Sequence, residues 1–158
     1  MYTRILIPTD GSELSNKAVQ YGIALAKTVD AKVVVLTVQP PFRQVDDPDG
    51  LGEESNSYAQ RMERCAAEVL NPAAEAATCA GVACETVHVA HEHIYRAIID
   101  TANSKACDLI VMASHGRKGM AAILLGSETI KVLTHCSIPV LVHRDPHLSA
   151  AQLLTALS

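Results

Sequence analysis

Short runs of aliphatic and β-branched residues alternate along the chain with longer segments of helical periodicity, and this alternation most constrains the fold. The run Lys-Val-Val-Val-Leu-Thr-Val at residues 32–38 is almost continuously apolar, which is typical of a strand covered on both faces. Because strand–helix alternation favours a parallel sheet with helices on both faces, we predict an α/β chain. The predicted strands are residues 3–7, 32–38, 82–89, 108–113 and 139–143.

Apolar residues at helical spacing predict four helices between these strands. The turn and cap residues Asp10-Gly11-Ser12 precede the first helix. Asn71-Pro72 should kink or break the second, because proline lacks an N–H group, and an Ala-rich continuation should resume until Gly81. The residues that recur at helical spacing are, for the first helix, Leu14, Ala18, Tyr21 and Leu25, and for the second, Tyr58, Met62, Cys65, Ala66 and Val69. For the third helix they are Ile94, Ala97, Ile98, Thr101 and Ala102. A fourth helix is predicted over Ser127–His135, with Ile130 and Leu133 buried.

Composition sets the broad class of protein. The chain has 158 residues, 49% hydrophobic and 19% charged, which suits one folded domain. A net charge of −4 without a dense basic run argues against nucleic acid as a main partner. No apolar stretch suits a bilayer span or a signal peptide, so we expect a cytoplasmic protein without membrane contact. Five cysteines without Cys-x-x-Cys spacing should be reduced and mostly buried thiols: Cys65, Cys79, Cys84, Cys107 and Cys136.

Two segments with small residues suggest a cradle for phosphates. Met112-Ala113-Ser114-His115-Gly116 stands where an apolar strand ends, and Gly126-Ser127 follows a nine-residue spacer where a helical pattern begins. Small residues let the backbone approach a bound group, and the N–H groups of a helix start attract anions. Asp10 ends the first strand. Since ligands bind at the carboxyl ends of parallel strands, these segments predict one site at that edge of the sheet.

The chain here resembles the universal stress protein family over about residues 1–144. Four pieces carry the resemblance: Ile7-Pro8-Thr9-Asp10-Gly11-Ser12, Asp108-Leu109-Ile110-Val111-Met112-Ala113-Ser114-His115-Gly116, Leu125-Gly126-Ser127 and Ser137-Ile138-Pro139-Val140-Leu141-Val142. The resemblance implies a three-layer α/β sandwich with a five-stranded parallel sheet, a Rossmann-like fold of the adenine-nucleotide-alpha-hydrolase type. Residues 145–158 would form a C-terminal tail.

The ATP-binding branch of this family has the motif Gly, two residues, Gly, nine residues, Gly, then Ser or Thr. Gly116, Gly126 and Ser127 match it, whereas Ala113 replaces the first glycine and adds a methyl group near the ligand. The resemblance implies ATP or AMP as ligand, with the backbone of Val38 at the adenine and Met112 packed near it. The expected nucleotide-binding residues are Pro8, Thr9, Asp10, Val38, Met112, Ala113, His115, Gly116, Gly126, Ser127, Glu128 and Thr129.

Side-chain chemistry suggests roles at the two ends of this site. Gly126 would let phosphate oxygens approach, and Ser127 would cap the fourth helix or donate to an anion. The spacer cations Arg117 and Lys118 would close over a triphosphate. Asp10 suits the adenosine end, where hydroxyl and amino donors lie, although such a residue is more often a simple turn or cap.

Other charged and titratable residues limit this interpretation. Glu128 would be a like charge beside the phosphates, so we expect nucleotide binding to depend on Mg²⁺ or Mn²⁺. His115 suits either a phosphate contact or a solvated loop side chain. His88, His91 and His93 form a cluster whose spacing does not force convergence, which favours a surface cluster over a metal site.

Missing motifs disfavour the common enzyme classes. The sequence has no phosphate loop, dinucleotide fingerprint or nucleophile elbow, and no general base can be named, so we expect at most slow, incidental ATP hydrolysis. The first hypothesis is an adenine-nucleotide-binding regulator of the stress response that acts through an unknown protein partner. The alternative is a nucleotide-free dimeric interaction module with a degenerate pocket, favoured by Ala113 and Glu128. The strand from Pro139 to His143 is an apolar candidate edge, which predicts a homodimer.

Overall fold

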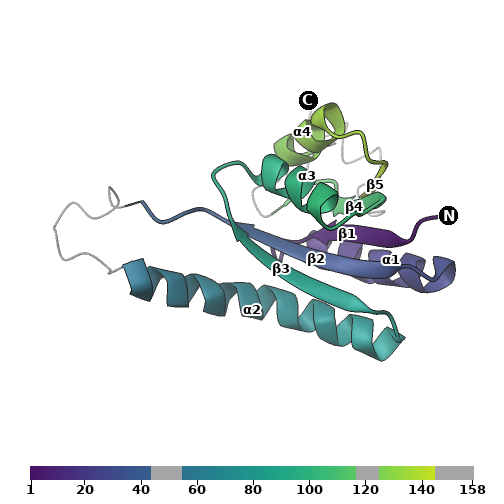
Figure 1. The fold of residues 1–158 in the computed structure, drawn as a ribbon, viewed down its shortest axis with the longest axis horizontal. Helices are drawn as coiled ribbons and strands as arrows, with labels where there is room; N and C mark the ends of the chain where they lie inside the picture. Colours follow the sequence, from purple (N-terminus) through teal and green to yellow (C-terminus); the bar gives the residue numbers. More distant parts are fainter. Residues whose placement is uncertain (44–54, 117–124, 145–158) are drawn as a thin grey trace, which may run out of the picture.

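The computed structural model describes residues 1–43, 55–116 and 125–144, and within them the chain forms one parallel five-stranded sheet in the order β3-β2-β1-β4-β5 (Figure 1). The Pro-, Asp- and Gly-rich residues 39–57 predict a loop, and its middle lies outside the described residues, as do Arg117, Lys118 and the tail. The predicted strands are confirmed to within one or two residues at most ends. They are β1 (Arg4–Pro8), β2 (Lys32–Gln39), β3 (Cys84–Ala90), β4 (Leu109–Ala113) and β5 (Val140–His143).

Four helices of the described chain cover the two faces of this sheet (Figure 1). One face packs on α1 (Glu13–Val29) and α2 (Ser55–Ala80), and the other on α3 (Ile94–Ser104) and α4 (Ser127–His135). The arrangement confirms the predicted three layers. Ser12 is the N-cap of α1, and its side chain accepts a hydrogen bond from the Ser15 N–H group, as its place in the turn predicts.

Burial on both faces explains the continuous apolar strands. On β1, Ile5 and Ile7 pack toward α1 and α2, whereas Leu6 packs toward α3 and α4. The register pairs Ile7 with Val35 on β2 and Leu6 with Ile110 on β4. Because helices cover both faces of the sheet, side chains on either side of β1 are shielded from water, and its three central residues are fully buried.

Of the two outcomes predicted at Asn71-Pro72, a break does not occur, since α2 continues through Pro72. Asn71 and Pro72 both lie on the exposed side of the helix. The backbone bond that proline cannot make therefore faces water, which replaces the missing partner. The opposite side of the same turn is held in the core by Leu70 and Ala73.

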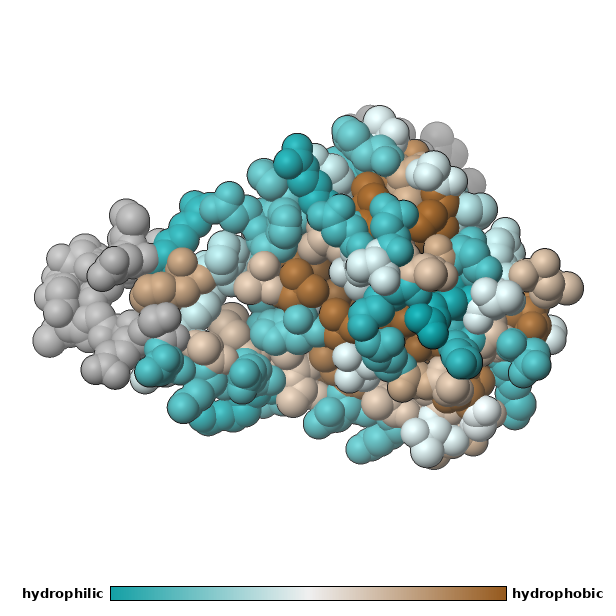
Figure 2. All heavy atoms as spheres, viewed as in Figure 1, coloured by the Kyte–Doolittle hydropathy of each residue, from teal (hydrophilic) through white to brown (hydrophobic). Residues whose placement is uncertain are grey.

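Two predictions of burial are also wrong. Ile130 and Leu133 of α4 are 49% and 42% exposed, because the face toward the sheet is formed by Thr129 and Val132 instead. Tyr21 of α1 is 45% exposed, and its ring contacts His143 on β5 with centroids 5.5 Å apart. Figure 2 shows hydrophobic residues at the surface over α3 and α4, surrounded by hydrophilic ones.

The cysteines are less buried than expected. All five are free thiols, but only Cys107 is buried, and Cys79 is exposed. Burial raises the pKa of the Cys107 thiol to about 11, which keeps it protonated at neutral pH. Among the described residues, no helix combines the length and apolar character that a bilayer span requires.

Candidate functional site

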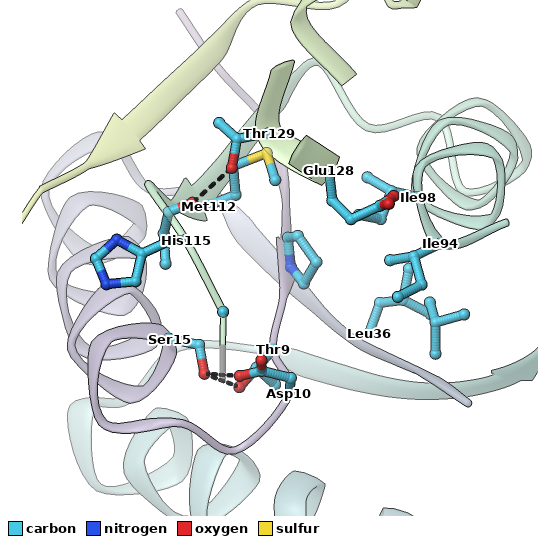
Figure 3. A pocket seen from close by; sticks show the side chains of 14 residues that line it. Thr9, Asp10, Ser15, Leu36, Ile94, Ile98, Met112, His115, Glu128 and Thr129 are labelled. Carbon is cyan, nitrogen blue, oxygen red and sulfur yellow. Dashed lines mark hydrogen bonds between the residues drawn. The ribbon is translucent and has the colours of Figure 1, made fainter. Parts of the chain in front are cut away.

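The carboxyl ends of β1 and β4 lie side by side at the point where the strand order reverses. From β1 the chain proceeds outward through β2 and β3, and it then returns to the other side of β1 with β4. Loops that leave adjacent strands in opposite directions open a crevice between them. A cleft lies at this place, lined by residues after both strands and by the first turns of α3 and α4 (Figure 3).

Asp10 is held at the β1 side of the cleft by a network of short polar contacts. Its Oδ1 accepts a hydrogen bond from the Ser12 N–H group at 2.9 Å. It accepts a second from the Ser15 hydroxyl, also at 2.9 Å (Figure 3). The Thr9 and Ser15 hydroxyls are 3.0 Å apart. Gly11 has a φ of +78°, which lets the chain turn tightly into α1. Asp10 is therefore both a turn residue and a fixed carboxylate at the cleft.

Gly116 completes this side of the site from the segment after β4. A Cβ atom at position 116 would lie 2.5 Å from Oδ2 of Asp10, closer than van der Waals contact allows. The neighbouring His115 is half-buried and lines the cleft, with its Nδ1 3.2 Å from the Ser114 hydroxyl. The sequence motif after β4 thus meets the motif after β1 directly.

The start of α4 is fixed against the end of β4. The Thr129 hydroxyl, buried at 2% exposure, donates to the carbonyl oxygens of Ala113 and Ser114 at 3.1 and 3.2 Å. Gly126 donates its N–H to the Ser114 carbonyl at 2.6 Å, and a Cβ there would lie 3.1 Å from Cα of His115. The nearby backbone of His115 therefore leaves little room for a side chain at position 126.

The N-terminus of α4 carries no side-chain cap. Gly126 occupies the N-cap position, so Ser127 is the first helical residue and its side chain makes no capping bond. The capping role considered for Ser127 is therefore wrong. The first N–H groups of a helix without such a cap carry partial positive charge and can donate hydrogen bonds to an anion or to water.

An apolar wall faces the polar segments across the cleft. Leu36 and Val38 come from β2, Met112 from β4, and Ile94 and Ile98 from the first turns of α3. Ile98 is buried, but Ile94 is 43% exposed at the cleft.

Ala113 replaces glycine without backbone strain. Within the described residues, positive φ angles occur at Asp30, Ala106, Gly11 and Gly81, and not at Ala113. Ala113 also packs in a small cluster with Leu14 and Ala18 of α1, so its methyl group has a place in the core.

Glu128 does not face the segment after β4. Its Oε2 accepts the N–H of Tyr95 on α3 at 3.0 Å, and its Oε1 lies 3.2 Å from Nζ of Lys131. In Figure 3 its carboxylate points toward Ile94 and Ile98 and away from His115. The expected like charge beside bound phosphates is therefore already paired with a helix N-terminus and a cation.

Most residues expected at the site come together in this cleft. Gly126 and Ser127 are not among its lining residues; they are the N-cap and the first residue of α4, next to the lining residues Glu128 and Thr129. Those that line it are Pro8, Thr9, Asp10, Val38, Met112, Ala113, His115, Gly116, Glu128 and Thr129.

Sequence reasoning missed four lining residues: Ser15, Leu36, Ile94 and Ile98. Leu36 is two residues before Val38, and so on the same strand face, which was a usable signal. Ile94 and Ile98 are one helical turn apart at the start of a helix. Their position at the carboxyl edge depends on where α3 packs, which spacing alone does not give.

Two residues of the histidine cluster, His91 and His93, contact each other. The Nδ1 of His91 accepts the N–H of His93 at 2.8 Å, and their ring centroids are 6.1 Å apart. Within residues 1–43, 55–116 and 125–144, no group of three His, Cys, Asp or Glu side chains is placed to hold a metal ion.

Fold and cleft together define a Rossmann-like α/β protein with a cleft at the switch point of a parallel sheet, the place where such folds bind ligands. The chain belongs to the universal stress protein family, whose family model matches residues 1–144. It is 33% identical over 152 residues to universal stress protein MJ0531 of Methanocaldococcus jannaschii, an alignment that covers 92% of this chain and 84% of the relative.

Solved structures share the fold over nearly the whole chain. MJ0577, a universal stress protein of the same archaeon, has a TM-score of 0.79 and 26% identity, covering 93% of this chain and 99% of its own. A universal stress protein solved in complex with cAMP has a TM-score of 0.66 and 26% identity, covering 94% and 99%. The fold is of the adenine-nucleotide-alpha-hydrolase type.

Proposed function

We propose that the cleft binds an adenine nucleotide, AMP or ATP, and that the chain is a regulator of the stress response without a catalytic step of its own. The observation that carries the proposal is the pairing of an apolar wall with the uncapped N-terminus of α4 and the fixed Asp10 carboxylate. A base, a ribose and a phosphate require these three surfaces in this combination. The related protein in complex with cAMP supports an adenine nucleotide as the ligand class.

In this proposal the base lies against Val38 and Met112 and covers the exposed part of Ile94. Oδ2 of Asp10 accepts a hydrogen bond from a ribose hydroxyl, because an ionised carboxylate only accepts. The phosphate lies near the first N–H groups of α4, where the helix dipole favours negative charge.

The proposal includes a divalent ion for ATP but not for AMP. Glu128 needs no Mg²⁺ or Mn²⁺ to bridge it to a phosphate, because its carboxylate contacts Tyr95 and Lys131. The triphosphate of ATP carries enough charge of its own to favour a bound cation.

The test is to denature freshly purified protein, identify released nucleotides by chromatography, and titrate stripped protein with AMP, ATP and GMP by calorimetry. We expect an adenine nucleotide in the supernatant and binding of AMP and ATP but not GMP. Absence of binding by all three would overturn the proposal and favour a nucleotide-free interaction module.

We also propose that two copies associate through β5. This strand lies at the edge of the sheet, and its residues Val140–His143 are only half-buried in one chain. No other strand of the described residues pairs with its outer edge, which therefore offers backbone groups to another chain. Nucleotide occupancy at the adjacent β4 would reach an unknown protein partner through this dimer.

A further inference from the structure

The first turn of α3 lacks a cap of its own. Its N-cap residue, His93, makes no side-chain capping bond, and no acidic residue stands in the first turn. Helices usually satisfy these N–H groups with a nearby Ser, Thr, Asp or Asn. In this chain the acceptor comes from another helix, because Oε2 of Glu128 on α4 accepts the Tyr95 N–H at 3.0 Å.

A second contact joins the same two helices. The Tyr95 ring packs against the His135 ring of α4, with centroids 5.2 Å apart, and Nζ of Lys131 lies 5.7 Å from the centre of the Tyr95 ring. Lys131 also lies 3.2 Å from Oε1 of Glu128. Glu128 thus receives a backbone N–H from α3 and an ammonium group from α4, which fix the direction of its carboxylate.

These contacts connect the two ends of the cleft. Tyr95 stands beside Ile94, which with Ile98 forms the α3 part of the apolar wall. Glu128 precedes Thr129, whose hydroxyl ties α4 to the carbonyl oxygens at the end of β4. One dipeptide on α4 therefore anchors both the α3 wall and the end of β4.

We propose that Glu128 is a positioning residue that holds the α3 wall of the cleft at the distance a nucleoside requires. This inference rests on the proposed adenine-nucleotide function and adds a determinant for the base end of the site. It differs from a role as a phosphate-repelling charge, because positioning affects ligands with and without a phosphate alike.

The experiment measures adenosine and AMP affinity by calorimetry for wild type, Glu128→Ala and Glu128→Gln. We expect Glu128→Ala to weaken both ligands by a similar factor, about fivefold to tenfold, since a charged acceptor of a backbone N–H is lost. Glu128→Gln keeps an acceptor oxygen and should restore most of the adenosine affinity. Glu75→Ala serves as control: Glu75 is exposed on α2, which packs on the opposite face of the sheet from α3 and α4.

Hydrogen exchange supplies a readout without ligand. The Tyr95 amide should exchange faster in Glu128→Ala than in wild type, with recovery in Glu128→Gln and no change in Glu75→Ala.

Two results would overturn the inference alone: tighter AMP binding with unchanged adenosine binding in Glu128→Ala, which indicates charge repulsion, or wild-type affinities for both ligands. If wild type binds neither adenosine nor AMP, the proposed function fails, and the binding role of Glu128 fails with it.

Discussion

Gly116 lies so close to the Asp10 carboxylate that a Cβ atom at position 116 would stand 2.5 Å from Oδ2. The carboxylate has little freedom to withdraw, because its Oδ1 is bonded to the Ser12 N–H and the Ser15 hydroxyl. The two residues follow different strands, β1 and β4, and are 106 positions apart in the chain. The position of the Asp10 side chain therefore favours glycine at position 116 over any residue with a Cβ atom.

Gly116→Ala should destabilise the protein by about 1 kcal/mol, the lower range for overpacking at a site that can partly relax. Urea unfolding would measure this for the single variant and for Gly116→Ala in an Asp10→Ala background. Because the clash partner is then absent, the cost should vanish in the double variant. An equal cost in both backgrounds would contradict the contact.

Asp10→Asn should reduce adenosine affinity about tenfold, since one hydrogen bond to a charged acceptor is lost. Asparagine keeps the oxygen that Ser12 and Ser15 need, but it places an NH₂ donor where Oδ2 would accept a ribose hydroxyl. Calorimetry checks this, with Asp100→Asn on the exposed side of α3 as the matched control. Equal losses in the two variants would argue against a ribose contact at Asp10.

The sequence was sufficient for the strands and the layers. Buried parallel strands appear in a sequence as short, continuous apolar runs such as residues 32–38. In a parallel sheet the segments that follow the first and fourth strands then lie at one edge, which places Asp10 and Gly116 together. Helix faces were harder to predict. Ile130 and Leu133 have the right spacing for burial, yet Thr129 and Val132 face the sheet. Thr129 is buried because its hydroxyl finds two carbonyl partners, which apolar periodicity cannot register.

The partners of charged site residues could not be derived from the sequence either. In the sequence, Glu128 directly follows Ser127 of the phosphate motif, so it is predicted to repel a bound phosphate. Its actual direction depends on the packing of α3 against α4, which brings the Tyr95 N–H within 3.0 Å. A contact between residues 33 positions apart leaves no local pattern to read.

AMP affinity should be the same within about twofold in EDTA and in excess Mg²⁺, since no unpaired Glu128 charge has to be bridged. ATP affinity should instead fall in EDTA, because its triphosphate carries more charge. Calorimetry of both ligands in both buffers measures the difference. A loss of AMP binding in EDTA would restore the case for a metal at the protein site.

At micromolar concentration the protein should sediment at twice its chain mass of 16.8 kDa. The carbonyl groups of Pro139 and His143 bond to β4, so in a parallel strand the N–H of Val142 points to the free edge. Val142→Pro removes that N–H and should give monomers, whereas Val142→Ala, which keeps it, should remain dimeric. A monomeric wild type would rule out association through β5 at that concentration.

Asp108 should make stability depend on pH in the acid range. Burial raises the pKa of its carboxyl group, but hydrogen bonds from the N–H groups of Arg4 and Thr3 and from the Thr3 hydroxyl outweigh burial, so the pKa lies below its ordinary value of 3.8. The unfolded chain therefore binds this proton more tightly than the folded one. The stabilisation is complete above about pH 4, near that ordinary value, and is lost as the pH falls through the folded-state pKa.

Asp108→Asn should accordingly be less stable than wild type at pH 7, by about 0.5–1 kcal/mol because solvent screens this partly exposed group. The difference should shrink in strong acid, where the wild-type carboxyl group becomes protonated and accepts the same N–H groups less strongly. Urea unfolding at pH 7 and in the acid range measures both values, with Asp100→Asn as control. A gap that stays constant with pH would mean that the hydrogen bonds from Thr3 and Arg4 do not depend on the charge of Asp108.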